Sequence, residues 1–140
     1  MFLNTSDLDA SIYPEIKQAI ARGQEDIVNL HINEALSFIQ SRLLTKYDIA
    51  AEFAKQGDAR HPLLMKYAKD ITIYYLYDLP ESIPAKRVKA YMDAEKWLDD
   101  LNKGFAVLAG VALAPVDDQA PLLPTNAQFG GNPKRNNNDW

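Results

Sequence analysis

Hydrophobic residues recur at helical spacing through the first hundred positions, and proline and glycine residues mark where each helix should begin and end. We expect two short helical turns, one capped by Thr5 or Ser6 with Leu8 and Ile12 on one side, and one from Asp48 through Phe53. The same spacing predicts four longer helices, over residues 14–22, 26–45, 62–78 and 84–102.

Two of the long helices have a clear apolar stripe. The helix over residues 84–102 should bury Ala90, Tyr91, Ala94, Trp97, Leu98 and Leu101. The helix over residues 26–45 should bury Val28, Ile32, Ala35, Leu36, Ile39 and Leu43. Three apolar residues fall outside this second stripe and indicate either a second contact face or isolated exposed side chains: Leu30, Phe38 and Leu44.

The helix over residues 62–78 is more apolar than one buried face requires. One continuous face consists of Leu64, Tyr67, Ala68, Ile71, Tyr74 and Tyr75, and from Ile71 to Tyr77 only Thr72 is polar. A helix that is apolar all round must be covered on two sides. The additional side chains, Ile73, Leu76 and Tyr77, therefore lie either at a boundary between subunits or under the segment formed by residues 105–114.

Residues 105–114 change the pattern, because apolar residues alternate without any charge. Alternation predicts a short strand or extended arm. The sequence has no second strand-like run, so the arm should lie against its own domain or pair with another chain. Its candidate partner contacts are Phe105, Val107, Leu108, Val111 and Leu113.

Residues 115–140 lack apolar periodicity and are rich in proline, asparagine and glycine, a composition typical of an extended, disordered tail. The tail either binds a partner or is held by its own domain, and Phe129, Lys134, Arg135 and Trp140 are the candidate contacts. We thus predict a mainly α fold: a helical bundle over residues 1–104, an arm over 105–114 and a tail over 115–140.

Composition narrows the classes of function. The net charge of −4 does not favour a general phosphate-binding surface or an anionic membrane. The absence of cysteine excludes disulfides and thiolate chemistry, and is consistent with a reducing cytoplasm. The first residues lack the features of a signal peptide, and the longest apolar run is too short to span a bilayer, so we expect no membrane association.

The residues that could catalyse a reaction or bind a metal, cofactor or nucleic acid do not occur at the spacings that such sites require. His31 and His61 are not paired at metal-ligand spacing, and packing or capping explains them better. Gly130-Gly131 lacks the strand-to-helix context of a phosphate loop. Clustered tyrosines are expected to pack in the core or between subunits rather than stack on bases. We therefore expect no enzyme, no metal and no cofactor.

The order of the apolar motifs resembles a known family. A helix ends in Phe38-Ile-Gln-Ser-Arg-Leu-Leu-Thr-Lys-Tyr47, the central helix contains Asp70-Ile-Thr-Ile-Tyr-Tyr-Leu-Tyr-Asp78, and the last helix ends in Leu101-Asn-Lys-Gly104. These motifs are similar to those of the tailed-phage head-to-tail connector (adaptor or head completion) proteins, in particular the Mu-like prophage branch. The resemblance covers roughly residues 3–113 and does not include the tail.

The resemblance implies a structural role in the neck of the virion. Such a subunit would assemble in the host bacterial cytoplasm into a ring of about a dozen copies. The ring would bind the portal protein on one side and tail or stopper proteins on the other, with DNA passing through its lumen without sequence-specific contacts. An alternative from the residues alone is a cytoplasmic helical interaction module, regulatory or chaperone-like, that dimerises through the segment from Tyr74 to Tyr77.

Overall fold

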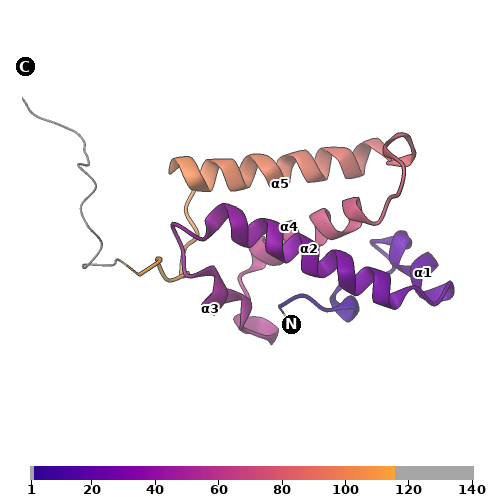
Figure 1. The fold of residues 1–140 in the computed structure, drawn as a ribbon, viewed down its shortest axis with the longest axis horizontal. Helices are drawn as coiled ribbons and strands as arrows, with labels where there is room; N and C mark the ends of the chain where they lie inside the picture. Colours follow the sequence, from indigo (N-terminus) through magenta and orange to yellow (C-terminus); the bar gives the residue numbers. More distant parts are fainter. Residues whose placement is uncertain (1, 116–140) are drawn as a thin grey trace, which may run out of the picture.

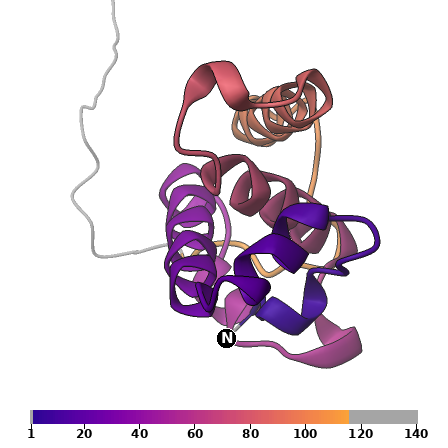
Figure 2. The same ribbon diagram turned by 90° about the vertical axis from the view of Figure 1, so that its right-hand side faces the viewer.

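Residues 2–115 are described by a computed structural model, and this part of the chain forms α-helices and no β-sheet, as predicted. The helices are α1 (Pro14–Ala21), α2 (Glu25–Leu43), α3 (Ile49–Phe53), α4 (Pro62–Tyr75) and α5 (Ala85–Lys103). Three short 3-10 turns lie before or between these helices, at Thr5–Asp7, Gly57–Ala59 and Pro80–Ser82. Helices α2, α4 and α5 pack against one another and form the centre of the bundle (Figures 1 and 2).

The apolar stripes place α2 and α5 as the sequence predicts. All six predicted residues of α2 are buried, because their spacing of three and four keeps them on one face. In α5 the aliphatic residues Ala94, Leu98 and Leu101 are buried, whereas Ala90, Tyr91 and Trp97 are only half-buried. The helix ends at Gly104, whose φ of 82° lies in the left-handed region that favours glycine.

The central helix α4 is shorter than predicted. It begins at Pro62 as expected but ends at Tyr75, and Leu76 is its C-terminal cap. The apolar pattern continues past this point because Leu76 and Tyr77 still pack against the core after the chain has left the helix. Thr72 is fully buried, and its hydroxyl donates a hydrogen bond to the Ala68 carbonyl over 2.8 Å.

The predicted first helix is wrong in its cap and in one of its two apolar residues. The segment forms a 3-10 turn after Asn4, whose backbone N–H donates to the Asp7 carboxylate over 2.8 Å. Leu8 is buried, but Ile12 is 61% exposed. The Arg60 guanidinium donates hydrogen bonds to Asp7 and to the Phe2 carbonyl and so holds this N-terminal segment against a distant loop, a contact that local sequence spacing does not reveal.

The predicted strand over residues 105–114 is reduced to an isolated antiparallel bridge between Tyr47 and Leu113. Gly110, with a φ of 83°, turns the backbone and ends the alternation. The arm follows its own domain: the Asp48 N–H donates to the Ala112 carbonyl over 2.8 Å, and the Ala114 N–H donates to the Lys46 carbonyl over 3.0 Å. Of the two alternatives, contact with the arm's own domain is therefore confirmed.

Candidate functional site

Large apolar side chains remain exposed at both ends of the bundle. The end near the arm, where α2 and α5 finish, carries Leu44, Phe105, Val107 and Leu113. The opposite end, where α1 lies and α2 begins, carries Ile12, Ile20, Ile27 and Leu79. Where such side chains lie close together, they form the kind of surface that binds other proteins.

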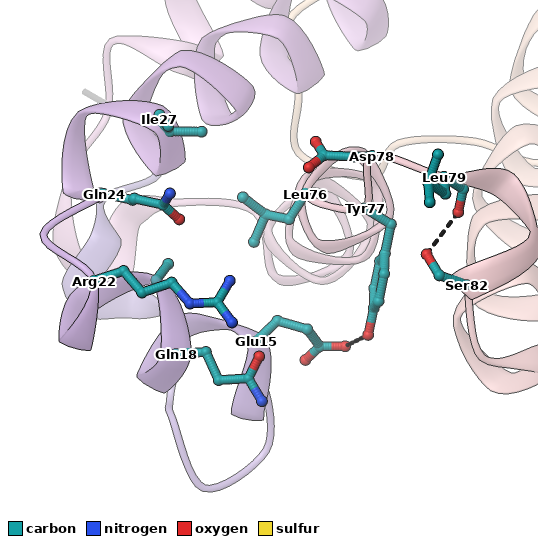
Figure 3. Close-up of a pocket in the computed structure, with 11 residues that line it drawn as sticks. Glu15, Gln18, Arg22, Gln24, Ile27, Leu76, Tyr77, Asp78, Leu79 and Ser82 are labelled. Carbon is teal, nitrogen blue, oxygen red and sulfur yellow. Dashed lines mark hydrogen bonds between the residues drawn. The ribbon is translucent and has the colours of Figure 1, made fainter.

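A pocket of about 340 Å³ lies at the α1 end (Figure 3). It is formed by α1, by the neighbouring start of α2 and by the chain after α4, which is distant in sequence. Ile27, Leu76 and Leu79 supply apolar surface, while Gln18, Arg22 and Gln24 supply polar groups. The pocket therefore combines apolar walls with hydrogen-bonding side chains, as binding sites usually do.

A buried ion pair lies beside the pocket, which its acidic member, Glu15, helps to line. Arg87 donates from Nε to Glu15 Oε2 over 2.8 Å and from Nη2 to Glu15 Oε1 over 3.0 Å. The Tyr77 hydroxyl donates to the same carboxylate over 2.6 Å, and the guanidinium also lies 5.1 Å from the centre of the Tyr13 ring. The side chains of Arg87 and Glu15 are only 10% and 13% exposed, so this ion pair links α1, α5 and the segment after α4 inside the fold.

The pKa values of Glu15 and Tyr77 are shifted in opposite directions by the contact between them. Burial alone would raise the pKa of Glu15, but hydrogen bonds from Arg87 and Tyr77 hold it below its ordinary value. Burial and the neighbouring Glu15 carboxylate raise the pKa of Tyr77 to about 12. At neutral pH the carboxylate stays ionised and the phenol stays protonated, which keeps the hydrogen bonds intact.

At the other end of the bundle, hydrogen bonds fix the backbone of the arm while its apolar side chains stay exposed. The Phe105 N–H donates to the Asp100 carbonyl over 2.8 Å, and the Leu108 N–H donates to the Tyr47 hydroxyl over 3.2 Å. Phe105 and Val107 are nevertheless 79% and 74% exposed. The arm thus presents apolar side chains from a backbone that is already ordered, which lowers the entropic cost of binding.

The structure divides the predicted partner contacts into groups. Phe105, Val107 and Leu113 are exposed, and Leu76 and Tyr77 are half-buried beside the pocket. Ile73, Leu108 and Val111 are buried in the subunit's own core, so they are not retained as partner contacts. Four further candidates lie outside the described residues: Phe129, Lys134, Arg135 and Trp140.

The aromatic residues and histidines take the packing and capping roles expected of them. Tyr67 stacks on Trp97 with ring centres 4.6 Å apart, and Tyr74 stacks on Tyr91 at 4.0 Å. His61 caps its own helix by accepting a hydrogen bond from the Leu63 N–H over 3.2 Å. Within residues 2–115 no group of three or more potential metal ligands comes together.

Sequence reasoning missed the Glu15–Arg87 pair, although one signal for it exists. Arg87 extends the buried stripe of α5 backwards by the same spacing of three and four that joins Tyr91, Ala94, Leu98 and Leu101. An arginine in that position needs a buried acidic partner. The sequence does not identify that partner, because Glu15 lies 72 positions away in the first turn of α1.

Comparison with known families identifies the chain's relatives. A family model described as Bacteriophage Mu, Gp36 matches residues 4–121. The chain belongs to this family. The Gp36 match confirms the phage origin that the sequence motifs indicate and extends beyond the last described residue. Comparisons with curated proteins and with solved structures gave no match. Among residues 2–115, no helix is long and apolar enough to cross a membrane.

Proposed function

We propose that this protein is a structural head-to-tail connector of a bacteriophage or prophage particle. Copies of the chain form a ring between the portal and the tail, and DNA passes through the ring. The family match over residues 4–121 carries the proposal, because it places nearly the whole bundle and arm in a phage Mu family. The two exposed apolar ends of the bundle support it further, because a ring subunit needs surfaces for its neighbours.

The proposed role involves no catalysis. The Glu15 carboxylate beside the pocket accepts hydrogen bonds from Arg87 and Tyr77, which hold it ionised. A carboxylate in that state has little tendency to accept a proton. The net charge of −4 also suits the wall of a DNA channel, because a strongly basic wall would bind phosphates and impede passage.

The alternative, a dimeric interaction module, requires the side chains from Tyr74 to Tyr77 to be available for contact with a second copy. Tyr74 stacks on Tyr91, and Tyr77 donates its hydroxyl proton to Glu15, so both make their main contacts within the subunit. These contacts leave less of the face available for a two-fold dimer.

Sedimentation velocity of the full chain, alone and mixed with the portal protein of the same phage, tests the proposal. We expect a closed assembly of about a dozen copies, formed either alone or on the portal. The expected complex is much larger than a dimer, so the two functions are distinguished by mass. A stable two-fold dimer that does not bind the portal would contradict the connector role and favour the interaction module.

A further inference from the structure

The arm and the pocket lie at opposite ends of the bundle and cannot meet within one chain. The long helices between the two ends, α2 and α5, have 19 residues each, which corresponds to about 28 Å at the helical rise of ~1.5 Å per residue. Hydrogen bonds to the Asp100 and Lys46 carbonyls hold the arm at its own end. An arm that enters this pocket must therefore come from a second copy.

The chemistry of the arm matches that of the pocket. Residues 105–114 contain no charged side chain, so docking removes no ion of the arm from water. On the pocket side, the Glu15 carboxylate already has Arg87 and Tyr77 as partners, so the arm can cover it without leaving that charge unpaired. Two further charged side chains of opposite sign, Arg22 and Asp78, also line the pocket. Ile27, Leu76 and Leu79 offer apolar surface for Phe105 and Val107, while Gln18 and Gln24 can hydrogen-bond to the arm's backbone.

From this complementarity we infer that the arm of one copy, led by Phe105 and Val107, docks into the α1-end pocket of the next copy. The inference rests on the proposed function and names the contact that builds its ring. The two surfaces differ, so the contact is heterologous, and such contacts close into rings when the rotation between copies allows it. The pocket's volume of about 340 Å³ lies near the lower limit for ligand sites, of about 300 Å³, which suits one or two apolar side chains.

Engineered cysteines test the contact directly, because the natural chain has none. In the full chain, Val107→Cys marks the arm and Leu79→Cys marks the pocket, and both positions are exposed. Under mild oxidation, a mixture of the two single variants should give a covalent dimer, and the double variant should give a ladder of higher multimers. Pairing Leu79→Cys with Met92→Cys, at an equally exposed position within α5, is the control and should give no ladder.

A second readout is the strength of self-association. Phe105→Ser should weaken it by about 10- to 100-fold, because a buried phenylalanine contributes an energy of that size. Met92→Ser should leave it unchanged. A covalent dimer of Val107→Cys with itself would show arm-to-arm contact and overturn the inference. Rings or portal complexes that form without the arm-to-pocket adduct would overturn this contact but not the proposed function, whereas a chain that never associates would overturn both.

Discussion

Replacing Glu15 with alanine should destabilise the fold by about 3 kcal/mol, because it leaves the buried guanidinium of Arg87 without its partner. The loss also removes the acceptor for the Tyr77 hydroxyl and separates α1 from α5. Chemical denaturation of the full chain, followed by circular dichroism, measures the free energy of unfolding. The value expected is at the low end for a buried ion pair, because both side chains retain some exposure.

Two controls separate the buried charge from other effects. The double variant Glu15→Leu with Arg87→Met should recover most of the stability, because it removes both charges and keeps the volume. Asp99→Ala, which breaks an exposed pair with Lys103, should barely shift the unfolding midpoint. If Glu15→Ala unfolds at the same denaturant concentration as the wild type, the ion pair does not hold the helices together.

The contribution of Glu15 to the free energy of unfolding should decrease as the pH falls. The folded-state pKa of Glu15 lies below its ordinary value, so its contribution is full above the unfolded-state pKa, about 4.3, and is lost as the pH falls through the folded value. The difference between the wild type and Glu15→Ala should therefore be largest near neutral pH and shrink in acid. A difference that grew in acid would contradict this assignment.

Replacing Ile71 with aspartate should prevent folding. Ile71 is completely buried at the centre of α4, between α2 and α5, and a carboxylate placed there has no partner. The cost is about 4 kcal/mol or more, a large share of the stability of a domain of this size. Circular dichroism should show loss of the helical signal at temperatures where the wild type is folded.

Ile71→Val is the matched control, because it keeps an apolar side chain and removes one methylene group. It should cost about 0.5–1.5 kcal/mol and leave the fold intact. A cooperatively folded Ile71→Asp variant with wild-type stability would mean that α4 does not occupy the core as described.

The long helices could be predicted because the spacing of apolar residues within each helix determines which face is buried. In α2, all six residues of the predicted stripe are buried, and Gly104 ends α5 where expected. The end of α4 could not be predicted in the same way. Leu76 and Tyr77 remain apolar for a tertiary reason, since they pack on the core after the helix has finished.

Features that depend on distant partners were missed for the same reason. Phe2 and Leu3 are buried at the N-terminus, and the Arg60 guanidinium that binds the Phe2 carbonyl lies 58 positions away. The pocket was not foreseen, because three separate segments form it. Each of these features requires long-range contacts that local periodicity does not encode.

The alternating apolar pattern of the arm predicts its conformation only in part. Its lack of charge and its apolar character correctly indicate contact with other elements of the domain, while Phe105, Val107 and Leu113 are exposed and stay predicted partner contacts. Strict alternation, however, would place Leu108 and Val111 on opposite faces, whereas both are buried. The turn at Gly110 changes the register between them, and a two-residue period cannot represent it.

The central claim, that this chain joins the head of a phage to its tail, is tested most directly by electron microscopy of particles produced when its gene is disrupted. The connector role predicts heads and tails that assemble separately and do not join, and joining should return when the wild-type chain is supplied. Complete, tailed particles in normal number without the chain would contradict the claim.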